Sequence, residues 1–182
     1  MHYLTYVFIP CDRPVEAAVC EAMTPFADGL EVKPWKRPLA TAEVAVMARR
    51  YGLPARDLAA LSARMREWTG RPGGVDEQGL FEEVTYNPDG KWDWYEVGGR
   101  WDGLLPGNSM PAGSLRRSQL LKKLAPYDFI TPDGVWHSKA LRVTRGWPPL
   151  VIEKSDRRWL AELKAALEAH PAHRVVGVDR HS

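Results

Sequence analysis

The spacing of hydrophobic residues changes from helical to strand-like near the middle of the chain. Residues 3–9 form a nearly continuous apolar and aromatic run, which is typical of a strand covered on both faces. Over residues 15–26, 42–51 and 55–69, apolar residues recur every three or four positions, and this spacing predicts three helices. Gly52 and Gly70 follow the second and third of these segments, where a glycine commonly ends a helix.

Two Pro-Asp-Gly turns interrupt strand-like segments in the second half of the chain. The tetrapeptides are Asn-Pro-Asp-Gly at 87–90 and Thr-Pro-Asp-Gly at 131–134. Proline presets the first corner of a type I turn and glycine takes the left-handed conformation of a bulge, so each tetrapeptide predicts a β-hairpin. The first hairpin is expected to join residues 80–86 to residues 91–97.

The last part of the chain has the pattern strand, helix, strand. Leu160, Leu163 and Leu167 mark one face of a helix that Ser155 can cap, and Pro171 follows its end. We expect the flanking strands to be parallel, joined by a right-handed crossover. The predicted fold is therefore α+β: a small mixed sheet with two x-Pro-Asp-Gly hairpins and a C-terminal βαβ unit, with helices packed on the sheet. We expect one domain over residues 1–182, with residues 40–70 as a helical insertion or subdomain.

Composition narrows the class of protein only a little. The chain has 182 residues, 45% of them hydrophobic and 26% charged, which is ordinary for a globular protein. A net charge of +2 does not by itself indicate a nucleic-acid or membrane partner. Cys11 and Cys20 are expected to be free thiols in a reducing compartment. The first apolar run is short and lacks a basic leader, so we expect a cytoplasmic protein without a membrane partner.

The first predicted hairpin has an aromatic face and a polar face. If its turn is the bulged type I form, Trp92 and Trp94 lie on the buried face, while Lys91, Asp93 and Tyr95 lie on the other. Aspartate is disfavoured in strands. Asp93 is therefore either a structural partner of Thr85 or Lys91, or a carboxylate that lines a pocket beside the Tyr95 hydroxyl.

A glycine pair follows this hairpin. Gly98 and Gly99 allow either a sharp bend or a close approach of a ligand to main-chain N–H groups. Arg100 offers a planar fork of donors for carboxylate or phosphate, and Trp101 can stack on Arg100 or on a ligand ring. The pair does not belong to a G-x-G-x-x-G motif, and the chain shows no Cys-x-x-Cys or His-x-x-x-His spacing, so the sequence identifies no cofactor and no metal ligands.

A second group of candidate residues lies at the end of the sequence. Asp179 and His181 are two apart in a predicted strand and so point to the same side. Such a pair can orient a general base or form part of a metal site. The alternative is a solvated terminus without chemistry.

The segment from Tyr86 to Gly103 resembles a group of uncharacterised bacterial and phage-encoded proteins. Their shared string is Tyr-Asn-Pro, then Lys-Trp-Asp-Trp-Tyr, then Gly-Gly-Arg-Trp, and it is accompanied by a terminal Val-Asp-x-His, here residues 178–181. The resemblance covers roughly the second half of the chain. It implies no activity, but it suggests that the hairpin residues and the terminal residues belong to one design.

Three functional hypotheses remain open at this stage. The first is a pocket for a small anionic or nucleotide-like ligand, with or without hydrolytic or transfer chemistry. In this hypothesis the ligand is bound by Lys91, Gly98, Gly99, Arg100 and Trp101. Protons are donated or accepted by Asp93, Tyr95, Asp179 and His181.

The second hypothesis is a non-enzymatic binding module for a host protein or single-stranded nucleic acid. Its contact residues would be Trp35, Trp101, Trp147 and the basic residues Arg116, Arg117, Lys122 and Lys123. The third is that the tryptophan-rich segment only specifies a hairpin core.

Overall fold

The chain forms two compact units, one of which is inserted into the other. A computed structural model describes residues 1–115, 125–143 and 151–182. The main unit consists of Met1–Asp28 and Asp89–Ser182, and the inserted unit is Gly29–Pro88. The predicted insertion at residues 40–70 lies within this inserted unit.

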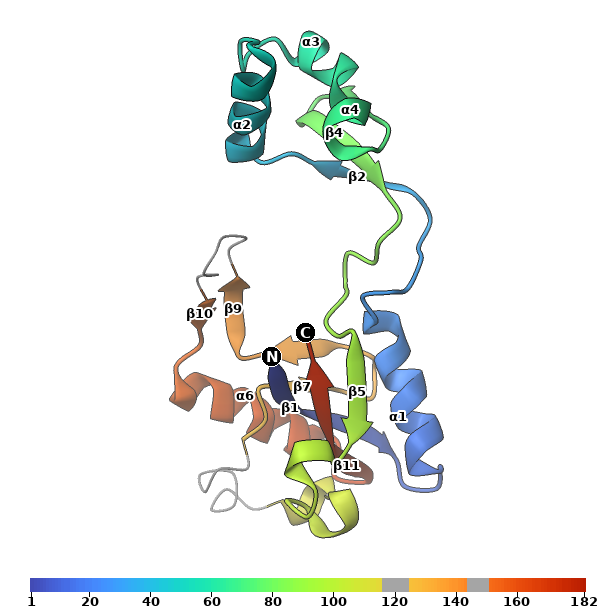
Figure 1. Ribbon diagram of the computed structural model, residues 1–182. Coiled ribbons are helices and arrows are strands. Elements are labelled where there is room, and N and C mark those ends of the chain that lie inside the picture. Colours follow the sequence, from blue (N-terminus) through green and yellow to red (C-terminus); the bar gives the residue numbers. More distant parts are fainter. Residues whose placement is uncertain (116–124, 144–150) are drawn as a thin grey trace. The chain divides into compact units, whose positions relative to one another are not determined.

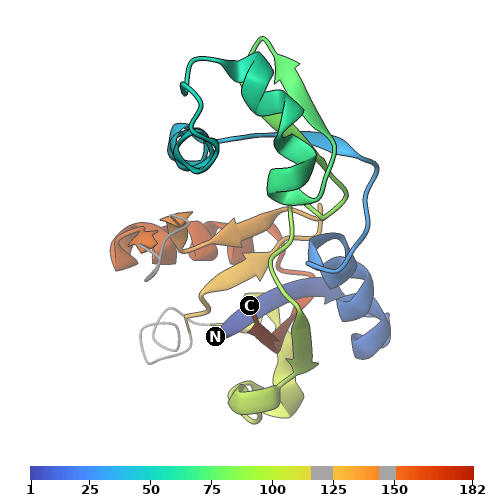
Figure 2. The same cartoon turned by 45° about the horizontal axis from the view of Figure 1, so that its top comes forward.

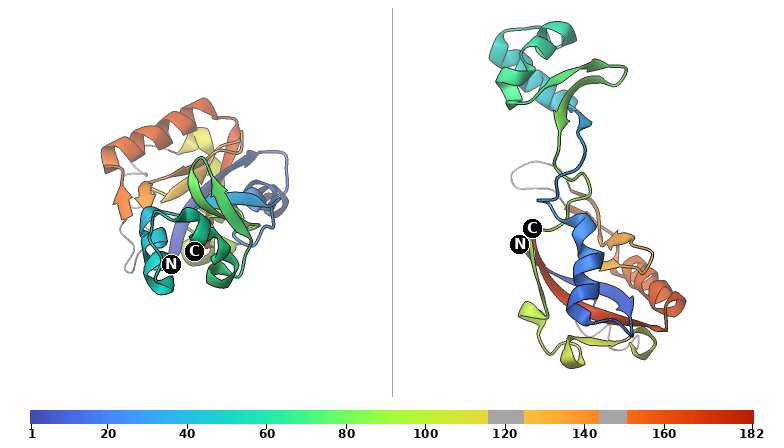
Figure 3. Two further views of the ribbon diagram at one scale, coloured as in Figure 1. Left: turned by 90° about the horizontal axis from the view of Figure 1, so that it is seen from above. Right: turned by 90° about the vertical axis from the view of Figure 1, so that its right-hand side faces the viewer.

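A six-stranded mixed sheet forms the centre of the main unit (Figure 1). Its main path has the order β5-β11-β1-β7-β8, and β6 pairs with β11 beside β5. The strands are β1 (His2–Pro10), β5 (Trp94–Val97), β6 (Ser109–Pro111), β7 (Asp128–Ile130), β8 (Trp136–Ser138) and β11 (His173–His181). β1 pairs parallel with β7, and every other pairing in this sheet is antiparallel. The first and last strands lie side by side and antiparallel, so the two marked ends of the chain lie close together at one end of these strands (Figures 1 and 3).

One helix covers each face of this sheet (Figures 1 and 3). Side chains alternate along β1, so Tyr6 and Phe8 pack with Trp159 and Leu163 of α6 (Asp156–Ala169). Val7 and Ile9 face the other way and pack against α1 (Val15–Met23). This explains why the first strand is apolar along its whole length: both of its faces are buried.

The inserted unit has its own small core. It contains β2 (Trp35–Pro38), α2 (Thr41–Tyr51), α3 (Leu58–Ala63), α4 (Met65–Thr69), β3 (Gly73–Asp76) and β4 (Gly79–Val84). The three strands form an antiparallel sheet in the order β2-β4-β3, and the helices lie beside it (Figure 2). Met47, Leu61, Met65 and Leu80 are buried between helices and sheet. As predicted, Gly52 and Gly70 end helices in the left-handed conformation.

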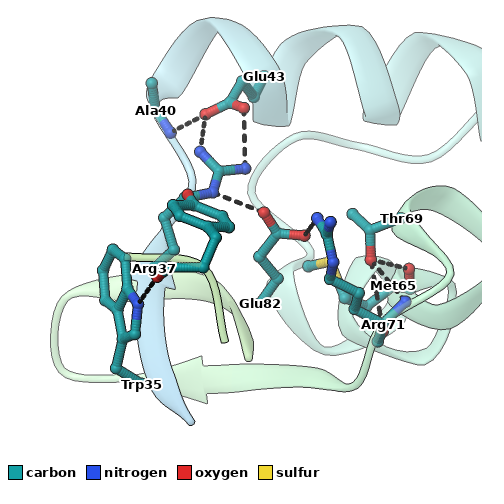
Figure 4. A network of polar contacts seen from close by, with 9 residues as sticks. Trp35, Arg37, Ala40, Glu43, Met65, Thr69, Arg71 and Glu82 are labelled. Atoms are coloured by element: carbon teal, nitrogen blue, oxygen red, sulfur yellow. Dashed lines mark hydrogen bonds and ion pairs between the residues drawn. The ribbon is translucent and has the colours of Figure 1, made fainter. Parts of the chain in front are cut away.

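A partly buried ion network joins the elements of the inserted unit (Figure 4). The Arg37 guanidinium donates to Glu82 at 2.6 Å and to both carboxylate oxygens of Glu43 at 3.0 Å. Glu43 also accepts a hydrogen bond from the backbone N–H of Ala40 at the start of α2. The two carboxylates raise the pKa of Arg37 above its ordinary value. The network therefore fixes β2, α2 and β4 together.

The first predicted hairpin does not form. β4 pairs with β2 and β3 inside the inserted unit, whereas β5 pairs with β11 in the central sheet. The Asn-Pro-Asp-Gly segment thus connects two units instead of closing a ribbon, because β4 pairs on both of its sides within the inserted unit and β5 pairs with the nine-residue β11. The expected cross-strand register between residues 83–87 and 91–95 is wrong as a consequence.

Two other expectations have different outcomes. The second hairpin is confirmed: β7 and β8 pair antiparallel, and Gly134 takes a φ of 76° at the turn. The order strand, helix, strand near the end of the sequence is also confirmed, but the parallel crossover is wrong. β10 (Val151–Glu153) pairs with β9 (Ala140–Val143) in a separate two-stranded sheet, while β11 pairs antiparallel with β1.

The cysteines and the helix lengths complete the description of the fold. Cys11 and Cys20 are both free and exposed. Within the described ranges, no helix combines the length and the apolar character needed to cross a lipid bilayer. The overall class is α+β, as the sequence pattern predicted.

Candidate functional site

Two aspartate–histidine pairs lie next to each other at the end of the central sheet where β1 begins and β11 ends. His2 lies opposite His181 in the antiparallel register of β1 and β11. The two imidazole rings are in edge-to-face contact with centroids 5.2 Å apart. Asp179 lies two residues before His181 on the same face of β11, and Asp93 lies just before β5 on the other side of His181. The sequence hypothesis had paired Asp179 with His181; the structure pairs each with a different partner.

The first pair consists of His2 and the buried Asp179. Asp179 is 1% exposed, and its Oδ1 lies 2.9 Å from Nδ1 of His2. A carboxylate can only accept hydrogen bonds, so Nδ1 of His2 is the protonated nitrogen. The second ring nitrogen, Nε2, then carries the lone pair when the imidazole is neutral. This arrangement fixes the tautomer and the orientation of a general base.

The glycine pair explains how the Asp179 carboxylate is held. Its Oδ2 accepts a hydrogen bond of 3.1 Å from the backbone N–H of Arg100. A Cβ atom at Gly99 would lie 2.5 Å from Cβ of Asp179, so a larger residue would push the carboxylate away from this N–H group. Gly98 and Gly99 also have φ angles of 76° and 51°, which favour glycine. The bend interpretation is confirmed, whereas the group that approaches the main-chain N–H of Arg100 is the Asp179 carboxylate and not a ligand.

The second pair lies closer to solvent. Nδ1 of His181 donates to Oδ1 of Asp93 at 2.8 Å, and the two side chains are 41% and 54% exposed. This hydrogen bond lowers the pKa of Asp93 below its ordinary value. The structure thus pairs Asp93 with His181 instead of with Thr85 or Lys91, and the Tyr95 hydroxyl interacts with Cys20. Asp93 orients the terminal histidine in the way that Asp179 orients His2.

A hollow of about 510 Å³ adjoins His2. This first hollow is lined by His2, Tyr3, Leu4, Trp101, Ala125, Pro126, Tyr127, Lys139, Asp156, Trp159 and Leu160. Its volume lies in the range that takes a small organic ligand. Asp93, Asp179 and His181 are not among the residues that line it. His2 and Trp101 thus connect the histidine pairs to a space in which a ligand fits.

Two cationic side chains near this hollow, Lys139 and Arg100, differ in whether they form ion pairs. Lys139 is neutralised by Asp156 at 2.9 Å and Glu153 at 3.2 Å. Arg100 is exposed and forms no ion pair with any residue that the structure describes. It lies in the same 3₁₀ turn (Gly99–Trp101) as Trp101, which lines the hollow. Arg100 itself is not among the residues that line the first hollow.

Two predicted site residues lie away from this cluster. Tyr95 packs on the α1 face of the sheet, with its ring in edge-to-face contact with Trp92 at 4.8 Å. Burial, with a contribution from Cys20, raises the pKa of Tyr95 to about 12, so its hydroxyl stays protonated near neutral pH. Lys91 lines a different, second hollow of about 770 Å³, together with Lys154, Trp136 and Arg180. The chain bends at Asp93, and the strict alternation assumed for residues 92–95 is lost there.

The tryptophans of the motif have separate environments. Trp92 packs in the α1 cluster and donates its indole N–H to the Met23 carbonyl, so its core role is confirmed. Trp94 was expected in the core but is 45% exposed, and its ring touches that of His2 with centroids 6.0 Å apart. Trp147 and the basic residues Arg116, Arg117, Lys122 and Lys123 lie outside the described residues.

The sequence hypothesis missed His2. A histidine at position 2 carries no signal by spacing, since its neighbours His181 and Asp179 are about as distant along the chain as possible. The missing information was the antiparallel pairing of β1 with β11, which brings the ends of these strands together. Among the described residues, no group of three or more His, Cys, Asp or Glu side chains is arranged to hold a metal ion.

No family model, curated protein or solved structure matches this chain.

Proposed function

We propose that the main unit binds a small anionic ligand in the first hollow and transfers a proton to or from it through His2. One observation carries this proposal. Asp179 holds Nδ1 of His2, while the same imidazole lines a hollow of about 510 Å³. An oriented imidazole at the wall of a ligand-sized space is the arrangement that general acid–base chemistry requires.

The other residues have supporting roles in this proposal. Arg100 supplies positive charge for the anion, and Trp101 supplies an aromatic wall. Asp179 and the N–H of Arg100 position His2 and do not touch the ligand. His181, oriented by Asp93, is a second proton-transfer group next to the first, with ring centroids 5.2 Å apart. A base and an acid side by side suit hydrolysis or group transfer.

A binding experiment with adenosine monophosphate (AMP) tests the proposal. AMP offers both the phosphate and the ring that the hollow should accept, and p-nitrophenyl phosphate serves as the turnover probe. We expect saturable AMP binding that perturbs the ring signals of His2 in NMR spectra and weakens at least about tenfold in Arg100→Gln, the loss of one charge-assisted contact. Turnover should be lost in His2→Gln. If a panel of small phosphates and carboxylates leaves His2 unperturbed, or if His2→Gln keeps full turnover, the proposal is wrong.

A further inference from the structure

The inserted unit carries an arginine-rich face that the proposed ligand site does not use. Residues 44–71 contain six arginines and two acidic residues, whereas residues 73–84 contain four acidic residues and no basic one. The six are Arg49, Arg50, Arg56, Arg64, Arg66 and Arg71, and all of them are exposed. Exposed arginines are thus concentrated in residues 49–71, whereas the acidic residues lie on β3, β4 and their turn, and β2 carries Lys36 and Arg37.

Two of these arginines form an ordered pair on an aromatic base. Cζ of Arg50 lies 5.4 Å from the ring centre of Trp68 and 6.0 Å from that of Tyr51. Cζ of Arg64 lies 5.9 Å from the same Tyr51 ring. Tyr51 and Trp68 touch edge to face and are half-buried against the core of the unit. Both guanidinium groups are therefore held in place, and less conformational entropy is lost when they bind.

Few acidic groups neutralise this face. Arg64 has an exposed partner, Glu67, at 3.3 Å, and Arg71 lies 3.6 Å from the buried Glu82. Arg49, Arg50, Arg56 and Arg66 form no ion pair with any described residue. Arginine rather than lysine supplies every charge, and its planar fork matches the oxygens of a phosphate group. A surface with several such forks on adjacent helices fits a partner with regularly spaced phosphates.

We propose that α2, α4 and the junction between α3 and α4 bind the phosphate backbone of duplex DNA, with Arg50 of α2 and Arg64 of the junction as central contacts. The aromatic rings decide between duplex and single strand. Single strands need open ring faces on which bases stack, but the faces of Tyr51 and Trp68 lie under the arginines. A duplex keeps its bases stacked inside and presents phosphates to the protein. This inference is independent of the proposed ligand site in the main unit.

Fluorescence anisotropy of the full chain with a labelled 20-base-pair duplex tests this inference. Binding is expected at about 50 mM salt. The logarithm of the binding constant should then fall linearly with the logarithm of the salt concentration, because binding releases counterions from the DNA. In the double variant Arg50→Gln with Arg64→Gln, the magnitude of the salt slope should fall by about two, one unit for each lost phosphate contact. The variant Arg50→Lys with Arg64→Lys should keep the slope but bind more weakly, since it keeps the charge and loses the forks.

A matched control separates the arginine face from net charge. Arg13→Gln with Arg157→Gln removes two exposed arginines from the main unit and should leave the salt slope unchanged. The proposal is overturned by three results: no duplex binding at 50 mM salt, equal slopes for the two double Gln variants, or tighter binding of a single strand than of the duplex. Binding to poly-glutamate that depends on Arg50 and Arg64, without duplex binding, would assign the face to an acidic protein instead.

Discussion

His2 and Asp179 come from opposite ends of the chain, yet each depends on the other for its role. Asp179 is buried with two donors, the His2 ring and the Arg100 N–H group. Asp179→Asn should leave His2 without a fixed tautomer, because an amide can either donate or accept. The ring nitrogens of His2 in NMR spectra of the folded variant report this directly. An unchanged tautomer in Asp179→Asn would mean that the carboxylate has no orienting role.

Gly99 is expected to be the least replaceable residue of the motif. Gly99→Ala places a Cβ 2.5 Å from that of Asp179 at a φ of 51°. We expect a loss of unfolding free energy on the order of 1–3 kcal/mol, measured by urea denaturation. Gly29→Ala is the control, because nothing lies within 4 Å of its added Cβ and its φ is not positive. That change should stay below about 1 kcal/mol.

The exposed pair of Asp93 and His181 should matter for chemistry more than for stability. Asp93→Asn replaces a carboxylate that can only accept by an amide that can donate or accept, so His181 loses its fixed tautomer. Turnover of a phosphate probe should then fall while the melting temperature stays nearly unchanged. Asp12→Asn, another exposed aspartate, is the control for the charge change. A large drop in melting temperature for Asp93→Asn would indicate a structural role instead.

The same pair predicts a pH effect with a definite direction. The hydrogen bond from His181 lowers the pKa of Asp93 in the folded chain. A carboxylate with a lowered pKa contributes stability above its unfolded pKa, and this contribution is lost as the pH falls through the folded pKa. The His181–Asp93 hydrogen bond should therefore persist through the ordinary titration range of aspartate and break only below it. The chemical shift of His181 Nδ1 against pH measures this, and a transition at the ordinary aspartate value would contradict it.

At the scale of elements, the central sheet depends on an ion pair buried under its α1 face. Arg180 of β11 binds Asp128 of β7 with its Nε at 2.9 Å, and the side chains are 7% and 1% exposed. Asp128→Ala would leave Arg180 buried without its carboxylate, at a cost of about 3–5 kcal/mol by denaturation. Asp76→Ala removes a surface partner of Lys36 and should cost less than about 1 kcal/mol.

The sequence predicts the elements of this chain better than their pairing. Hydrophobic spacing locates α1, α2 and α6, and local turn chemistry locates the β7–β8 hairpin, because these depend on residues close together in sequence. The pairing of β5 cannot be located in this way, because its partner β11 lies about eighty residues later in the sequence. For the same reason, the sequence places Asp93, Asp179 and His181 among the candidate residues but misses His2. Long-range strand pairing, which no local pattern encodes, assembles the site.

On the scale of the whole molecule, two units with separate cores have separate candidate roles. The main unit presents the histidine pairs and the first hollow, and the inserted unit presents the arginine face. The core of the inserted unit lies entirely within Gly29–Pro88. Substitutions on the arginine face should consequently leave His2 and its hollow intact, and AMP binding by the Arg50→Gln and Arg64→Gln double variant provides that comparison. Loss of AMP binding in this variant would show that the two roles are not separate.

The most direct test of the account is the long-range ¹H–¹⁵N spectrum of the His2 ring in the full chain, recorded with and without AMP. The geometry predicts that Nδ1 of His2 is protonated, that Nε2 is the bare nitrogen of the neutral imidazole, and that the signal of Nε2 shifts when the ligand binds. A ring protonated at Nε2, or a bare Nε2 that stays unmoved at saturating concentrations of each small anion tested, would contradict the central claim.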